Sequence, residues 1–172
     1  HGAPEHTSLP VVFEVRDLSV YYGSFRAVRE VNLDVRQREI TAFIGPSGCG
    51  KSTTGKLILR LQEPTSGEIL WRGRNIEKLS ASEVRPVRRE LQAVFQDPYS
   101  SLNPRMRAAD IVAEPLRNFE GLSGAAARER VARLFERVGL RADQMVKFPF
   151  EFSGGQRQRL GIARALSVQP KL

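Results

Sequence analysis

The spacing of hydrophobic residues predicts a chain that begins with β-strands. Residues 11–22 (VVFEVRDLSVYY) are rich in β-forming side chains with imperfect alternation, whereas Val31, Leu33 and Val35 alternate strictly with polar neighbours. Residues 40–44 (ITAFI) form a short, nearly all-apolar run, as a central parallel strand would. The first quarter of the chain therefore predicts two half-buried strands and one fully buried strand.

The rest of the chain reads mainly as helix. In chain order, the pattern predicts a helix over 51–62, a strand over 68–71, a helix-prone stretch over 80–90, a strand over 91–95, irregular structure over 97–104, and helices over 107–118, 123–138 and 154–167. Gly139 is expected to terminate the helix over 123–138, and Ser153 to cap the last one.

Composition is ordinary for a globular protein, with 41% hydrophobic and 27% charged residues in a chain of 172. No apolar run approaches the length that spans a bilayer, and no secretory segment is present. Residues 1–10 (HGAPEHTSLP) are expected to be a flexible tail or a cloning remnant. Cys49 is the only cysteine, which excludes an internal disulfide and fits a reducing compartment.

The net charge of +8 raises the question of a nucleic-acid partner. The excess lies in residues 85–172, with 16 basic and 9 acidic side chains, largely as Arg along the expected helices. Glu129 and Glu136 interrupt that row, which favours a solvated face that docks a partner over a surface that tracks phosphates. We therefore expect no nucleic acid, although a soluble protein acting on nucleic acid stays open as a minor alternative.

A glycine-rich loop follows the apolar run at 40–44 and precedes the expected helix at 51–62. Glycines free the backbone to wrap a polyphosphate, and the helix adds the positive end of its dipole. The lysine is expected to reach the β- and γ-phosphates, and the serine after it to ligate Mg²⁺. The loop matches the P-loop pattern at every position: Gly45, Pro46, Ser47, Gly48, Cys49, Gly50, Lys51, Ser52, Thr53.

A second glycine motif lies about a hundred residues later, in residues 152–166 (FSGGQRQRLGIARAL). A hydroxyl and two glycine amides at a helix N-terminus again make an anion site. The expected site residues are Ser153, Gly154, Gly155 and Gln156. This stretch resembles the signature motif of ABC transporter ATPases, which the P-loop alone would not distinguish from kinases or GTPases.

The resemblance covers residues 11–172 and implies a P-loop α/β core, an antiparallel β subdomain at the N-terminus and a helical subdomain. It implies ATP and Mg²⁺ as cofactors, with the signature motif contacting the γ-phosphate held by a second subunit in a head-to-tail dimer. Gln96 resembles the glutamine-loop residue that contacts Mg²⁺ and water, so Gln96 and Lys51 are the expected catalytic residues. Tyr22 resembles the aromatic residue that stacks on adenine.

The same resemblance implies domains at 11–103, the nucleotide-binding core, and 104–172, the helical subdomain with the signature motif. It also implies transmembrane permease subunits as partners and a peripheral location on the cytoplasmic face of the inner membrane. The implied function is the ATP-binding motor of a bacterial importer of the peptide type.

The resemblance is not uniform along the chain. Residues 12–53 look most like phosphate-import ATPases, and residues 54–172 look most like oligopeptide- and dipeptide-import ATPases, which normally carry an acidic residue in place of Pro46. A recombinant chimera that binds nucleotide without hydrolysing it is therefore the alternative hypothesis.

In the family, residues like 169–172 (QPKL) lead into the Walker B strand, with its Mg²⁺-binding aspartate and catalytic glutamate, and a switch histidine follows later. None of these residues occurs within the 172 residues. Hydrolysis requires a residue that positions and deprotonates the water. The expectation is therefore that this chain alone binds ATP but does not turn it over.

Overall fold

The computed structural model describes residues 9–172, so the expectation of a flexible tail falls mostly outside the described residues. The chain separates into two units, with the boundary between Val84 and Arg85. The helical subdomain expected over 104–172 lies within the second unit. Of the helices in the described part, none is both long and apolar enough to cross a membrane.

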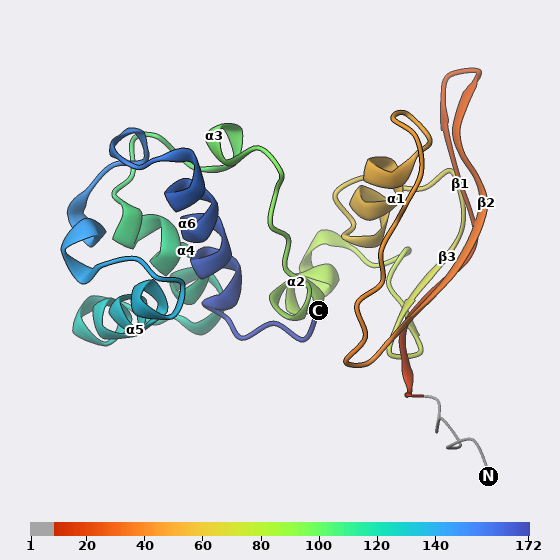
Figure 1. Ribbon diagram of the computed structural model, residues 1–172. Helices are drawn as coiled ribbons and strands as arrows, with labels where there is room; N and C mark the ends of the chain where they lie inside the picture. Colours follow the sequence, from red (N-terminus) through yellow and green to blue (C-terminus); the bar gives the residue numbers. More distant parts are fainter. Residues whose placement is uncertain (1–8) are drawn as a thin grey trace, which may run out of the picture. The chain divides into compact units, whose positions relative to one another are not determined.

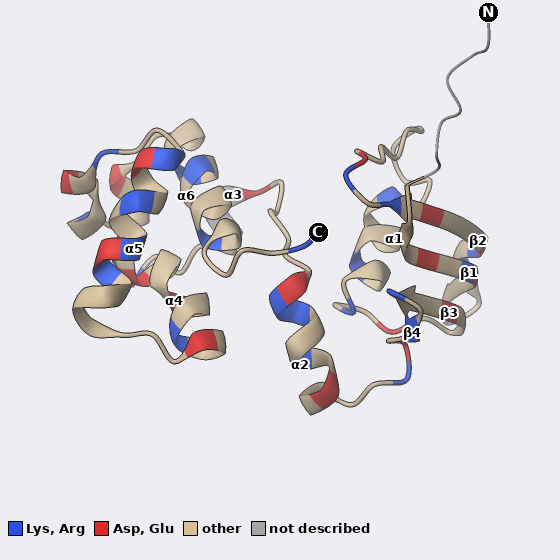
Figure 2. Cartoon of the chain, turned by 90° about the horizontal axis from the view of Figure 1, so that it is seen from below, with Lys and Arg blue, Asp and Glu red and all other residues tan. Residues whose placement is uncertain are grey.

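The first unit is built on a four-stranded antiparallel sheet in the order β2-β1-β3-β4. The three longer strands are labelled in Figure 1, and all four in Figure 2. The two long strands form a hairpin whose last pair is Tyr22 and Phe25. The strands expected over 11–22, around 31–35 and over 68–71 are confirmed. Their bounds are β1 Val11–Tyr22, β2 Phe25–Arg36, β3 Ser66–Trp71 and β4 Arg74–Asn75.

One face of this sheet carries the core of the first unit. Phe13 and Trp71 lie opposite each other on β1 and β3, with ring centroids 6.0 Å apart, and both are buried. Register shifts between Val15 and Leu18 explain the imperfect alternation of the sequence, because a shifted register lets both side chains face the core.

Helix α1 (Lys51–Ile58) lies beside the sheet in the first unit. Leu57 and Ile58 are buried, as the sequence pattern predicts. The helix was expected to run to residue 62, but it ends at Ile58, and Arg60 already has a positive φ of 52°. Leu61 is 51% exposed because it no longer lies on the helix face that packs on the sheet.

The prediction of a buried strand over 40–44 is wrong. This segment has no regular secondary structure, and Ile40 and Ile44 are 100% and 94% exposed. A parallel strand needs hydrogen-bonding neighbours on its sides and apolar cover on its faces. No strand of the described residues pairs with this segment, so its apolar side chains stay in solvent.

The second unit is helical. The stretch at 80–90 and the three long helices of the sequence pattern are confirmed within a few residues at each end. Helix α2 crosses the boundary between the units and the others follow, with bounds α2 Ala81–Glu90, α3 Pro98–Ser101, α4 Ala108–Glu120, α5 Gly124–Arg137, η1 Ala142–Val146, η2 Pro149–Glu151 and α6 Gly154–Leu166.

The core of the second unit forms where α4, α5 and α6 pack together (Figure 1). Leu116, Phe135 and Leu160, one from each helix, are fully buried there. Gly139 has a φ of +74° directly after α5, so it ends that helix as predicted.

The prediction of a strand over 91–95 is wrong, and 97–104 is not wholly irregular because it contains the short helix α3. Only the start of the segment over 91–95 forms backbone hydrogen bonds with another part of the described chain. The Gln92 N–H donates to the Leu172 carbonyl at 3.0 Å, and Lys171 and Leu172 donate to the Glu90 carbonyl. Beyond Gln92 no described strand pairs with this segment, and Phe95 is 44% exposed.

Candidate functional site

The glycine-rich loop leads directly into the N-terminus of α1. Gly48 and Gly50 have φ angles of +80° and +95°, which side chains with a Cβ rarely adopt. Gly50 is the N-cap of α1 and has no side chain to cap the helix, so the first-turn N–H groups are open to a ligand. A Cβ at Gly50 would also lie 3.1 Å from the Ala27 carbonyl on β2, so the loop lies close against the sheet.

Lys51 closes the loop over its own backbone. Its ammonium donates to the carbonyl oxygens of Gly45 and Pro46, each at 2.7 Å, and lies 3.4 Å from the Cys49 thiol. A Cβ at Gly45 would lie 2.8 Å from the Cys49 sulfur, so only glycine fits there without a shift. The expected phosphate-binding lysine is therefore held at the centre of the loop.

The loop borders a hollow of about 360 Å³ that Cys49, Gly50 and Lys51 line together with β2 and residues 42–44. Ser47 and Ser52 are exposed, and Thr53 is half-buried. A hydroxyl at a helix N-terminus suits Mg²⁺ that is held mainly by phosphate oxygens and water, because Mg²⁺ usually takes few ligands from the protein.

Tyr22 ends β1 in the same unit and is 52% exposed. Its hydroxyl lies 2.9 Å from Oε1 and 2.7 Å from Nε2 of the Gln62 amide. The ring is therefore available to a ligand, while the hydroxyl is held by a residue forty positions away. Gln62 is a contact that the sequence pattern does not reveal.

Gln96 lies in the second unit, exposed, just after the segment at 91–95. The segment that follows it is tied to α6, because the Arg164 guanidinium donates to the Ser101 carbonyl of α3 at 2.8 Å. Burial lowers the pKa of Arg164, and the negative charge of Glu114 partly offsets this shift. The guanidinium stays charged at neutral pH, because arginine is effectively always protonated in proteins.

Ser153 is the N-cap of α6, as predicted. Its hydroxyl accepts a hydrogen bond from the Gln156 N–H at 3.3 Å, and the Gln156 side chain accepts one from the Ser153 N–H at 3.0 Å. This reciprocal pair is a capping box, which the Ser-x-x-Gln spacing could have indicated. Gly154 and Gly155 are exposed in the first turn, and a Cβ at either would meet nothing within 4 Å, so the site is open.

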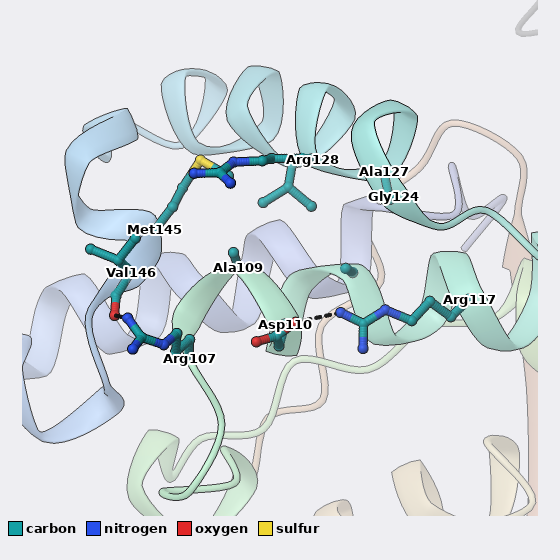
Figure 3. Close-up of a pocket in the computed structure, with 11 residues that line it drawn as sticks. Arg107, Ala109, Asp110, Arg117, Gly124, Ala127, Arg128, Met145 and Val146 are labelled. Atoms are coloured by element: carbon teal, nitrogen blue, oxygen red, sulfur yellow. Dashed lines mark hydrogen bonds and ion pairs between the residues drawn. The ribbon is translucent and has the colours of Figure 1, made fainter.

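A groove of about 310 Å³ lies between α4, α5 and η1 in the second unit (Figure 3). Its lining is apolar along Ala113, Val131 and Met145. The Arg107 guanidinium donates to the Val146 carbonyl at 2.8 Å, whereas Arg128 has no ion pair among the described residues. The sequence pattern does not reveal this groove, because its walls come from three separate elements.

The family model described as "ABC transporter" matches residues 28–172. A probable peptide ABC transporter ATP-binding protein, y4tS of Sinorhizobium fredii, is 50% identical over 86% of this chain and 42% of its own length. The oligopeptide transport ATP-binding protein OppF of Haemophilus influenzae is 42% identical over 98% of this chain and 52% of its own length. The glutathione import ATP-binding protein GsiA of Escherichia coli is 49% identical over 85% of this chain and 23% of its own length.

Among solved structures, the dimeric ABC transporter cassette MJ0796 superposes with a TM-score of 0.83 at 32% identity, over 92% of this chain and 70% of that one. A post-hydrolysis state of the same cassette, bound to ADP and phosphate, gives the same values. These likenesses confirm the predicted ABC ATPase fold.

The chain spans about a quarter to a half of the length of these curated relatives. The alignment with OppF runs across the P-loop and over nearly the whole chain, so the comparisons give no support to a chimera joined there. The phosphate-import resemblance of residues 12–53 likewise has no counterpart among these relatives. With an open P-loop, a capped signature helix and a family match over most of its length, the chain belongs to the ABC transporter family.

Proposed function

We propose that the chain is the nucleotide-binding part of the ATP-hydrolysing subunit of a bacterial importer of the peptide type. The observation that carries the proposal is the pair of helix N-termini at the two glycine motifs: α1 has no side-chain cap, and α6 is capped at Ser153 but leaves Gly154 and Gly155 exposed. Both present backbone N–H groups to an anion. The relatives named for peptide, oligopeptide and glutathione transport support the substrate class.

In this proposal the P-loop binds the phosphates of ATP, and the Lys51 ammonium exchanges the Gly45 and Pro46 carbonyls for phosphate oxygens. Ser52 and Gln96 are the proposed Mg²⁺ ligands, and Mg²⁺ would neutralise charge on the phosphates when bound. Tyr22 would stack on adenine, and Ser47, Gly48 and Thr53 would complete the phosphate cradle. Gln96 and Lys51 are the proposed catalytic residues.

Ser153 and the Gly154–Gly155 turn are proposed to bind the γ-phosphate of ATP held by a second subunit. The exposure of these residues supports binding in trans, because no part of the chain within residues 9–172 covers them. The dimeric state of the similar cassette MJ0796 supports the same arrangement. A head-to-tail dimer would therefore form two composite sites.

The groove between α4, α5 and η1 is the proposed docking site for a permease subunit, which places the chain at the cytoplasmic face of the inner membrane. An apolar groove with a basic rim suits an amphipathic helix that carries acidic residues. Figure 2 shows acidic and basic positions interspersed along α5, which favours docking of a protein over tracking of a nucleic acid.

Lys51→Ala is expected to abolish detectable ATP binding. The substitution removes the ammonium that lies against the Gly45 and Pro46 carbonyls of the loop, and a bound polyphosphate would lose its charge partner. Binding of a fluorescent ATP analogue to the purified protein measures this directly. An affinity equal to that of the unsubstituted chain would contradict the P-loop assignment.

Tyr22→Ala is expected to weaken ATP binding about tenfold, or roughly 1.4 kcal/mol, because a stacked ring is lost. Tyr22→Phe is the matched control, since it keeps the ring and removes only the contact with Gln62. Titration calorimetry with ATP should place the Phe variant within about twofold of the original. Equal losses in both variants would mean that the hydroxyl, and not the ring, matters.

Gly154→Asp, in the full-length protein, is expected to leave ATP affinity of the monomer unchanged and to abolish turnover. A carboxylate at the first turn of α6 would occupy the place of the partner's γ-phosphate and repel it. Phosphate release measures turnover, and nucleotide titration at low protein concentration measures monomer binding. If the substitution also removes monomer binding, the motif is structural.

Arg128→Glu is expected to weaken association with the permease at least about tenfold while ATP affinity stays unchanged. Arg137→Glu on the same helix is the matched control, because Arg137 is exposed and does not line the groove. Co-purification of the full-length subunit with its permease at several salt concentrations gives the measurement. Equal effects of both substitutions would show a dependence on net charge alone.

A further inference from the structure

Arg157 is a buried arginine near the N-terminus of the signature helix α6. Its side chain is only 6% exposed, although arginine is rarely buried without a specific role. A cation at this end of a helix also opposes the helix dipole. Helix stability alone would favour a carboxylate or a neutral side chain here, so the presence of Arg157 has to be explained by its contacts.

Those contacts fix the backbone around Ser153. The Arg157 guanidinium donates to the Phe152 carbonyl at 2.6 Å and to the Pro149 carbonyl at 3.3 Å. The Arg157 backbone N–H donates to the Ser153 carbonyl at 2.9 Å. One residue therefore holds the carbonyls on both sides of the Ser153 Cα.

The peptide group between Phe152 and Ser153 is held at both of its polar atoms. The Arg157 guanidinium donates to the carbonyl of this group, and the Gln156 side-chain oxygen accepts from its N–H at 3.0 Å. This peptide group cannot rotate without breaking a buried, charge-assisted hydrogen bond, which is stronger than one between neutral groups. The direction of the Ser153 side chain depends on the orientation of this group.

The tie also reaches the short helix that precedes the motif. Pro149 begins η2 and is buried, and Phe152 is 3% exposed. Side chains on a helix lean toward its N-terminus, so Arg157 reaches back over the start of α6 to this turn. Arg157 thereby joins η2 and α6 into one rigid support beneath the exposed Gly154–Gly155 turn.

We infer that Arg157 is a positioning residue that holds Ser153 and the glycine turn in the geometry that receives the nucleotide of the second subunit. It acts through the backbone of these residues and touches no ligand itself. The inference rests on the proposed function of the signature motif in trans. It adds a residue on which binding of the second subunit's nucleotide depends, whereas ATP binding at the P-loop of the same chain does not depend on it.

The test compares Arg157→Met, Arg157→Lys and the exposed control Arg137→Met in the full-length protein. For each variant, light scattering after size exclusion gives the ATP concentration for half-maximal dimerisation, and nucleotide titration gives monomer affinity. Arg157→Met should raise the ATP concentration for half-maximal dimerisation about tenfold and leave the ATP affinity of the monomer within about twofold. Arg157→Lys keeps the positive charge and a hydrogen-bond donor, so it should raise the ATP concentration for half-maximal dimerisation only about threefold.

The outcomes separate positioning from simple stabilisation. A structural role alone would lower the melting temperature and the folded fraction without moving the ATP concentration for dimerisation of the folded protein, and that result would overturn the inference. If Arg157→Met does not fold, Arg157→Lys decides, and unchanged dimerisation in that variant overturns the inference too. Gly154→Asp is measured in parallel. Normal dimerisation of Gly154→Asp would overturn the proposed function itself. If Gly154→Asp fails to dimerise while the Arg157 variants dimerise normally, only the role of Arg157 is overturned.

Discussion

Backbone N–H groups at the start of an α-helix have no partner within the helix, and both glycine motifs of this chain lie at such a start. The glycine-rich loop ends at Gly50, which leaves the first turn of α1 open. The signature motif starts at Ser153, which satisfies one of these donors and leaves Gly154 and Gly155 exposed. The two proposed sites would therefore share one physical basis, the attraction of an anion to a helix N-terminus.

The two N-termini differ in how firmly they are held. At the signature motif, the Ser153–Gln156 capping box and the Arg157 side chain fix the backbone before any ligand arrives. At the P-loop, the Lys51 ammonium donates to carbonyls of its own loop, and in the proposed function these bonds would break when a phosphate takes their place. The first arrangement suits a rigid surface that receives a partner, and the second suits a loop that closes around a ligand.

The helical unit supplies the rigidity that the signature motif needs. Leu160 of α6 packs with Leu116 of α4 and Phe135 of α5 in a fully buried cluster, so the axis of the signature helix is fixed by its neighbours. Arg164 extends this fixation to the segment after Gln96, through the Ser101 carbonyl. Two of these helices, α4 and α5, also form walls of the proposed docking groove, so a partner seated there would contact α4, which packs on α6. Docking and nucleotide contact in trans could in this way act on one packed body.

Local sequence determined the elements whose signals lie within a few residues. The strands of the hairpin, the helices over 107–118 and 123–138, the stop at Gly139 and the cap at Ser153 follow from periodicity and capping, which need no distant partner. The two glycine motifs are likewise recognised from spacing alone, and the roles of their residues stay predictions. The segments over 40–44 and 91–95 could not, because an apolar run becomes a strand only where another strand completes its hydrogen bonds. The contacts of Tyr22 with Gln62 and of Arg157 with Pro149, and the groove itself, were decided by tertiary packing, since each joins elements that are separate in the sequence and only the folded chain brings them within bonding distance.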